Sequence, residues 1–187
     1  MSSPAPESVQ RLFFALWPDE RLRSAFAHAT HKAARGCGGR PVPVASLHVT
    51  LAFLGSVAQR RIPELAALAR RVATQNPRLE LTFDRLEHWA KPQLLCAVSS
   101  APAPCAAAFS AALKRQVEAS GFSPDLKPFR AHVTVARKVV HSVHSQDMPP
   151  LLWAAGGFAL VSSRTDPEGP VYSVIESYAL YDGVRPG

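Results

Sequence analysis

Two segments far apart in the chain are near copies of each other, and both alternate in the manner of a β-strand. SLHVTLAFLG contains His48 and Thr50, and RAHVTVAR contains His132 and Thr134. The chain has seven histidines, so chance alone would supply roughly 0.2 His-x-Thr pairs. The repeat predicts a molecule built from two similar halves, each with one such strand.

Strand alternation places each histidine and its threonine on the same face. Successive side chains of a strand point to opposite faces, so residues i and i+2 lie side by side. His48 and Thr50 then face away from the core of their half, as do His132 and Thr134. If the halves face each other, the four side chains line one cleft. The residues expected on the core faces are Leu47, Val49, Leu51, Phe53, Ala131, Val133 and Val135.

Hydrophobic periodicity divides the rest of the chain into helices and strands. Helices are expected over 20–35, 61–75 and 103–119, with Asp19 as the N-cap of the first. Strands are expected over 11–17, 46–55, 79–83, 94–98, 130–137, 157–163 and 171–180. The polar segment 141–150, which ends in two prolines, is expected to be a loop. Neighbouring strands that outnumber the helices indicate an α+β fold with antiparallel sheets.

Length and composition suit one intracellular domain. A chain of 187 residues with 47% hydrophobic residues can bury one core. We expect a disordered leader over 1–10, the domain over 11–182 and a tail over 183–187. No apolar run reaches the roughly 20 residues that cross a bilayer, and the N-terminus lacks the pattern of a signal peptide. Three cysteines without CxxC spacing favour a reducing cytoplasm over a disulfide framework or a zinc site.

The net charge is +7 and the isoelectric point is about 9.8. A basic balance favours anionic partners such as nucleic acid, nucleotides or a membrane surface. The alternative is that the basic balance has no functional meaning, as in many small proteins.

Paired imidazoles and hydroxyls suit the chemistry of phosphodiesters. The pKa of imidazole lies near 6.5, so one ring can take a proton from water while the other gives one to a leaving oxygen. Threonine hydroxyls and an arginine can bind the phosphate oxygens. One alternative is that the histidines are merely polar residues of half-buried strands. A metal site is the other, but two histidines without an acidic or cysteine residue in their motifs are a poor ligand set.

The two motifs and their surroundings resemble the 2H phosphoesterase superfamily. Within it, the chain is similar to the bacterial and archaeal RNA 2',3'-cyclic phosphodiesterases, long named 2'-5' RNA ligases. The segments that carry the resemblance are RLFFALWPDE (11–20), GRPVPVASLHVTLAFLG (39–55), PFRAHVTVAR (128–137) and FALVSSRTDPEGPVYSVIESYAL (158–180). Ala131 departs from the family, which often has proline before the second histidine; this removes no chemical group.

The resemblance implies two pseudo-symmetric lobes of antiparallel sheet, with outer helices, around a V-shaped cleft. It implies hydrolysis of an RNA 2',3'-cyclic phosphate to a 2'-phosphate, with neither metal nor cofactor. His48 would be the proton donor to the leaving 3'-oxygen and His132 the proton acceptor from water. Thr50 and Thr134 would bind the phosphate.

Three further residues are candidates for substrate binding. Strand alternation places Arg137 opposite His132, and only the family resemblance assigns it to the cleft. Arg130 shares the face of His132, and its alternative is a solvated arginine at a strand end. Phe13 could stack on a base, or it could belong to the core.

Other functions remain open at the level of sequence. The same cleft could join RNA ends through a 2'-5' bond, or hydrolyse 2'-5' oligonucleotides or small cyclic nucleotides. A non-catalytic RNA-binding module is the rival outside enzymes, although such a module needs no proton donor and acceptor. We expect a monomer that binds RNA ends, with no membrane association and no obligate protein partner.

Overall fold

The fold consists of two antiparallel sheets and three α-helices in the part of the chain that the structure describes, residues 8–167 and 169–181. The structure is a computed structural model. The strands are β1 (Val9–Leu16), β2 (Arg40–Pro41), β3 (Val49–Ala58), β4 (Leu79–Trp89), β5 (Leu94–Val98), β6 (His132–Arg137), β7 (Gln146–Ala155), β8 (Gly157–Asp166) and β9 (Gly169–Ala179). The helices are α1 (Glu20–Gly36), α2 (Ile62–Gln75) and α3 (Pro104–Ala119), with short 3-10 turns at Val44–Ser46 and Gln59–Arg61.

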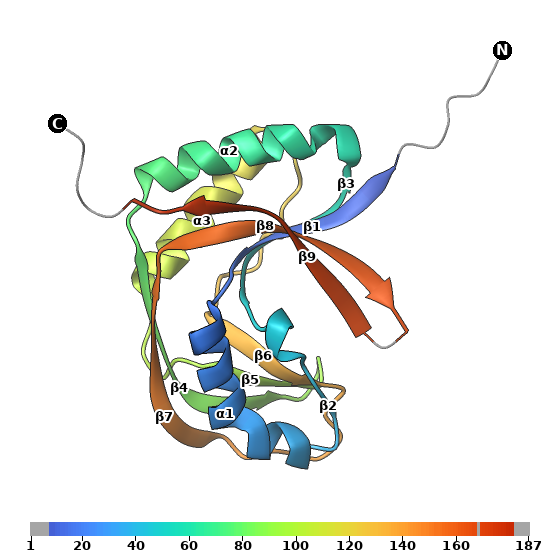
Figure 1. Cartoon of the computed structure of the whole chain (residues 1–187), viewed down its shortest axis with the longest axis vertical. Coiled ribbons are helices and arrows are strands. Elements are labelled where there is room, and N and C mark those ends of the chain that lie inside the picture. Colours follow the sequence, from blue (N-terminus) through green and yellow to red (C-terminus); the bar gives the residue numbers. More distant parts are fainter. Residues whose placement is uncertain (1–7, 168, 182–187) are drawn as a thin grey trace.

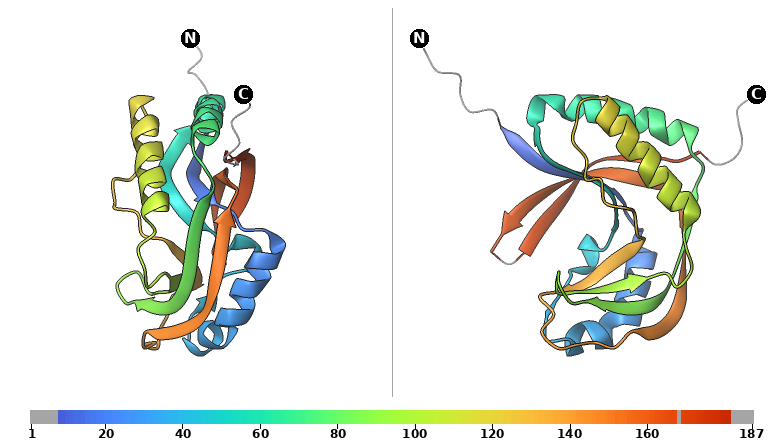
Figure 2. Two further views of the ribbon diagram at one scale, coloured as in Figure 1. Left: turned by 90° about the vertical axis from the view of Figure 1, so that its left-hand side faces the viewer. Right: turned by 180° about the vertical axis from the view of Figure 1, so that it is seen from behind.

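The two sheets repeat one arrangement of four strands. The first sheet has the order β3-β1-β8-β9, and the second has the order β2-β6-β5-β4-β7. If β3 is matched with β6, the remaining strands match in order, and β2 is an addition at the edge of the second sheet. All pairs of neighbouring strands in the two sheets are antiparallel. The sheets diverge in the views of Figure 2. The duplicated motif therefore marks a duplicated sheet.

The helices cover the outer faces of the sheets. Helices α2 and α3 lie over the first sheet, whereas α1 crosses to the second sheet and packs against β7 and β6 (Figure 1). The Asp19 carboxylate caps α1 by accepting a hydrogen bond from the Leu22 N–H at 2.8 Å. Phe26 of α1 lies fully buried with its ring 5.2 Å from that of Phe83 in β4. One continuous core therefore joins helices and both sheets.

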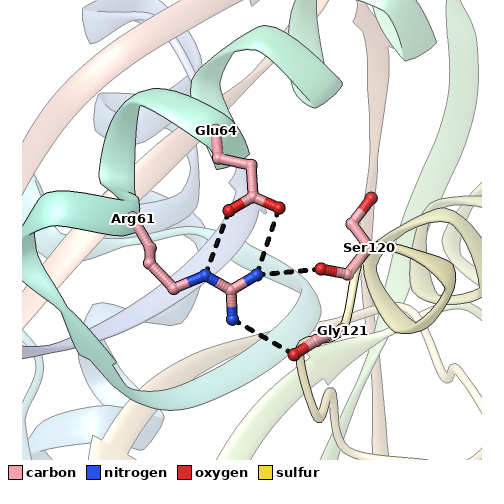
Figure 3. A network of polar contacts seen from close by, with 4 residues as sticks. All are labelled: Arg61, Glu64, Ser120 and Gly121. Carbon is pink, nitrogen blue, oxygen red and sulfur yellow. Dashed lines mark hydrogen bonds and ion pairs between the residues drawn. The ribbon is translucent and has the colours of Figure 1, made fainter.

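The Arg61 side chain ties the start of α2 to the end of α3 (Figure 3). Its guanidinium forms a bidentate ion pair with the Glu64 carboxylate, with N–O distances of 3.0 and 3.1 Å. It also donates to the carbonyls of Ser120 and Gly121, at 2.9 and 3.2 Å, and lies 3.7 Å from the centre of the Phe122 ring. A cation suits the carbonyl end of a helix. This contact fixes the beginning of the segment that leads from α3 to β6.

The expected loop over 141–150 is wrong, because residues 146–155 form β7. Pro149 and Pro150 misled the prediction, since proline cannot donate to a ladder of backbone hydrogen bonds. However, β7 is the edge strand of its sheet, and proline is tolerated on edge strands.

The strand that carries the first motif differs from its expected course. It begins at Val49 rather than at residue 46, and it continues past Gly55 to Ala58. Its pairing with β1 skips Leu51, because Phe14 lies opposite Ala52 and Ala15 lies opposite Thr50. The extra residue is a β-bulge, which turns Ala52 and Phe53 to the opposite faces from those predicted. A second shift skips Leu54, because Phe13 lies opposite Phe53 and Leu12 lies opposite Gly55.

The first strand begins at Val9, two residues earlier than expected. Most of the expected leader (residues 1–7) and the expected tail over 183–187 lie outside the described residues. Within the described residues, no helix is long and apolar enough to cross a membrane.

Candidate active site

The two histidines stand at matching places in the two sheets. His48 directly precedes β3 and His132 begins β6, and these two strands lie in contact. Thr50 lies opposite Ala15 of β1, and Thr134 lies opposite Cys96 of β5. Both threonines are half-buried. The structure therefore brings the two predicted motifs together.

Each histidine is held by the backbone two residues before it. His48 Nδ1 lies 2.7 Å from the Ser46 carbonyl oxygen, and His132 Nδ1 lies 2.8 Å from the Arg130 carbonyl oxygen. A carbonyl only accepts hydrogen bonds, so Nδ1 carries a proton in both rings. Nε2 is then the nitrogen of each ring that can give or take a proton. The two rings share one orientation device.

His48 lies within a box of aromatic side chains. Its ring stacks on Trp17, with centroids 5.3 Å apart and planes inclined by 14°. It meets Tyr172 edge-on at 5.1 Å and Phe13 at 5.1 Å. Such neighbours exclude water and offer no charge.

His132 has one aromatic neighbour and an ion pair beside it. The Trp89 ring lies 4.7 Å from the imidazole. Glu87 accepts hydrogen bonds from the Trp89 indole at 3.1 Å and from the Arg130 guanidinium at 2.6 Å. The Arg130 guanidinium also lies 5.1 Å from the Trp89 ring centre. Arg130 therefore has its carboxylate partner within the protein, and Glu87 positions the tryptophan that packs on His132.

Burial lowers the pKa of both histidines. Desolvation lowers the pKa of His48 from 6.5 to about 4, and the positive charges of Arg137 and His132 act in the same direction. The pKa of His132 is also lowered, first by desolvation and then by Arg130 and Arg137. The carbonyl hydrogen bonds oppose this effect in both rings. Both imidazoles are therefore neutral at neutral pH before an anion binds.

A bulge turns Arg137 toward the histidines, against its predicted parity. The pairing of β5 and β6 skips Val135, because Leu95 lies opposite Ala136 and Cys96 lies opposite Thr134. Val135 and Ala136 are both buried, and the half-buried Arg137 donates to the Tyr172 hydroxyl at 3.3 Å. The family resemblance placed this residue in the cleft, and the bulge explains how it arrives there.

The equivalent bulge in β3 exposes a side chain that the sequence analysis assigned to the core. Phe53 is 41% exposed, stacks on Phe13 with centroids 5.5 Å apart, and follows the skipped residue Leu51. Its core assignment was wrong because regular alternation was assumed through the bulge. Phe53 and Arg137 both stand five positions after their histidine, so they are equivalents in the two halves.

A pocket of about 450 Å³ lies beside His132. Thr50, Phe53, Trp89 and His132 are among its lining residues. Its wall includes the segment from α3 to β6, which Asp125 fastens to β3: the Asp125 carboxylate accepts the Phe53 N–H at 3.0 Å, and the Asp125 N–H donates to the Phe53 carbonyl at 2.9 Å. We name this the aromatic pocket.

Phe13 cannot stack on a base in this structure, because it is fully buried. It lies on the histidine side of the first sheet in a small cluster with Ala15, Ala159 and Val161. Its ring packs against the rings of His48 and Phe53. The core alternative for Phe13 therefore describes it better than substrate contact does.

The sequence analysis missed Trp17, Trp89 and Tyr172. Trp17 shares the parity of Phe13 and Ala15 in β1, so that alternation could have placed it beside the site. Tyr172 and Trp89 come from distant strands, and only the sheet pairing brings them to the histidines. Within residues 8–167 and 169–181, no group of three or more His, Cys, Asp and Glu side chains is arranged to hold a metal ion.

The chain resembles known proteins in sequence and in structure. The LigT like Phosphoesterase family matches residues 16–95. An RNA 2',3'-cyclic phosphodiesterase of Thermus thermophilus is 34% identical over 91% of this chain and 90% of its own length. Another protein of that name, from Escherichia coli, is 32% identical over 72% of this chain and 75% of its own length.

Solved structures show the same fold. The crystal structure of E. coli LigT complexed with 3'-AMP superposes with a TM-score of 0.80 at 27% identity, covering 92% of this chain and 99% of that one. Fold and site thus define a phosphoesterase with paired histidines. The chain belongs to the LigT-like phosphoesterase family, and it is a hydrolase. The predicted family and the α+β fold of two antiparallel sheets are confirmed.

Proposed function

We propose that this enzyme hydrolyses the 2',3'-cyclic phosphate at the end of an RNA and leaves a 2'-phosphate. The observation that carries the proposal is the matched pair of Nδ1–carbonyl hydrogen bonds at His48 and His132. They leave one reactive nitrogen on each ring. The names of the Thermus and E. coli relatives support the substrate.

The proposed step transfers two protons, forms one bond to phosphorus and breaks another. His132 Nε2 takes a proton from water as the water oxygen bonds to phosphorus. The bond from phosphorus to O3' breaks, and His48 Nε2–H gives its proton to that oxygen. The family resemblance supports this division of roles. Water regenerates the two protonation states after product leaves.

His48 must gain a proton before this step. In the free protein its pKa is about 4, so the neutral ring dominates at pH 7. A bound phosphate diester carries negative charge, which stabilises a nearby imidazolium and raises its pKa. Substrate binding and protonation of His48 are therefore coupled.

The remaining residues stabilise the phosphate. Thr50 and Thr134 donate their hydroxyls to non-bridging oxygens, and Arg137 neutralises charge that develops in the transition state. Arg130 contributes positive charge from the rim, since Glu87 already holds its guanidinium. The mechanism uses no metal, in keeping with the lack of acidic or cysteine side chains in either motif.

A cytoplasmic monomer without an obligate protein partner completes the proposal. All three cysteines are free and two of them are buried, which suits a reducing compartment.

The test is to offer an RNA oligonucleotide that ends in a 2',3'-cyclic phosphate. The expected product is heavier by one water and resists a 3'-phosphatase. Variants that lack either histidine serve as controls for a contaminating enzyme. A product sensitive to the 3'-phosphatase would contradict the regiochemistry, and a 2'-5' joined product with a second RNA would show ligation instead.

A further inference from the structure

A second groove adjoins the histidine site and shares no lining residue with the aromatic pocket. It has a volume of about 430 Å³ and runs between β2–β6 and the hairpin of β8 and β9. Ser46, whose carbonyl holds His48, lines it together with Arg137 and Tyr172. We name it the hairpin groove. Tyr172 also meets the His48 ring edge-on, so the groove adjoins the histidine site.

The hairpin groove concentrates positive charge. Arg40 and Arg137 stand directly opposite each other in the pairing of β2 with β6, and both line the groove. Like charges in that position repel and destabilise the strand pair. Lys138 adds a third cation, and Asp166 is the single carboxylate among the described residues of the lining. A bound anion would relieve the repulsion.

The backbone at Lys138 adopts an unfavourable conformation for a residue with a side chain. Its φ is +53°, and Gln93 next to it has φ +52°. The Val139 N–H donates to the Gln93 carbonyl at 3.0 Å, which joins the two turns. Backbone strain of this kind costs on the order of 1 kcal/mol or more and gathers at ligand sites. Here it turns the chain so that Lys138 follows Arg137 into the groove lining.

The aromatic pocket has a different character. Three lysine and arginine side chains line it, and two of them have an acidic partner within the protein: Arg130 pairs with Glu87, and Lys114 pairs with Asp125 at 3.2 Å. It offers the exposed face of Phe53 instead. Aromatic faces stack on unpaired bases, whereas arginine and lysine bind backbone phosphates. The two hollows suit different parts of one RNA end.

We propose that the hairpin groove binds the RNA phosphodiester on the 5' side of the terminal nucleotide, through Arg40 and Lys138. The terminal base then occupies the aromatic pocket, and the cyclic phosphate lies between the two. This inference rests on the proposed function and adds to it a preference for oligonucleotide ends over single nucleotides.

The test compares two substrates that differ only by that phosphodiester. One is a nucleoside 2',3'-cyclic phosphate, and the other is a dinucleotide that ends in the same nucleoside cyclic phosphate. The wild-type enzyme should show the higher kcat/KM on the dinucleotide. Arg40→Gln and Lys138→Asn should each lower kcat/KM on the dinucleotide about tenfold, as for a hydrogen bond to a charged group. Each should leave kcat/KM on the single nucleotide within about twofold of the wild-type value. Asparagine at 138 tolerates the left-handed backbone.

Arg71→Gln is the matched control, because it removes one charge from an exposed site on α2. It should change kcat/KM for neither substrate. The salt dependence of kcat/KM on the dinucleotide should also become shallower in the Arg40 and Lys138 variants, since one phosphate contact contributes a slope near 0.7 for single strands.

The outcomes separate the two proposals. If the wild-type enzyme hydrolyses neither substrate, the proposed function fails. If it hydrolyses both equally, or if the two variants lower both substrates alike, the phosphate subsite is wrong while the activity stands.

Discussion

The two halves of the site begin with the same sequence and end with different chemistry. In each, a histidine donates Nδ1–H to a carbonyl two residues back, a threonine follows two residues on, and a bulge skips the next residue. The residue that the bulge turns outward is Phe53 in one half and Arg137 in the other. Duplication thus supplies the frame, and one position in each half decides between stacking and charge.

The surroundings of the rings differ in the same way. His48 lies among three aromatic rings and its pKa falls to about 4, whereas His132 has one tryptophan and a nearby ion pair. Identical motifs therefore do not have identical surroundings. Two histidines held by the same backbone geometry but surrounded by different side chains can provide both a proton donor and a proton acceptor.

Removing either imidazole should have the largest effect. His48→Ala and His132→Ala should each lower kcat by about 10²–10⁴-fold, the usual contribution of a proton transfer. Single-turnover rates on the cyclic phosphate oligonucleotide measure this. The double variant should lose less than the product of the two losses, because the rings act as a unit. Two independent, fully multiplicative losses would break the proposed coupling.

The residues after the bulges should respond differently from each other. Arg137→Gln should lower kcat by about 10- to 150-fold, the range for a lost hydrogen bond to a charged group. Phe53→Ala should mainly raise KM, since a base–aromatic stack contributes about 1–3 kcal/mol to binding. Phe53→Trp keeps a stacking face and is the control. If Phe53→Ala lowers kcat and leaves KM unchanged, the two positions do not divide stacking from charge.

The threonines should matter less than the histidines and equally in the two halves. Thr50→Ala and Thr134→Ala should each lower kcat/KM about tenfold, because each removes one hydroxyl donor to the phosphate. Thr→Ser at each site restores the hydroxyl and should recover most of the activity. Losses as large as those of the histidine variants would mean that the hydroxyls do more than bind.

The pH profile tests the asymmetry directly. Turnover needs one protonated and one neutral ring, so the rate should follow a bell. Because burial lowers both pKa values in the free protein, the bell in kcat/KM should lie on the acidic side of neutrality. Bound phosphate raises the pKa of the donor, so the alkaline limb in kcat should lie at higher pH than the one in kcat/KM.

The single variants assign the limbs. His132→Ala should remove the acidic limb, where the acceptor loses its proton, and His48→Ala should remove the alkaline limb. The macroscopic values belong to the pair, so only the variants make this assignment. Reversed limbs would exchange the two roles, and a profile flat from about pH 5 to about pH 9 would remove both from proton transfer.

Chelation should have the smallest effect of all. Neither motif carries a carboxylate or a thiolate beside its histidine, so EDTA should leave the initial rate unchanged. The control is the same assay after dialysis against buffer alone. A loss restored by zinc or manganese would show that the histidines bind a metal.

The sequence predicted the paired motifs and the alternating sheets because period-two patterns and short-range spacing are local signals. His48, Thr50, His132 and Thr134 follow from them. Phe53 did not, since a bulge leaves no clear mark in a hydrophobic run such as Leu51-Ala52. β7 was missed because its prolines are acceptable only at a sheet edge, and edge position is a property of the whole fold. Trp89 and Tyr172 reach the histidines through pairing of distant strands, whereas Trp17 follows the parity of Phe13 and Ala15 and could have been found by alternation.

The carbonyl anchors have a consequence for how this site can vary. Ser46 and Arg130 orient the rings through their peptide oxygens, and every amino acid supplies a peptide oxygen. Mutation at these two positions can therefore change charge and shape at the rim of the site without disturbing the tautomer of either imidazole. Substrate preference is free to drift here over evolutionary time while the proton-transfer machinery stays in place.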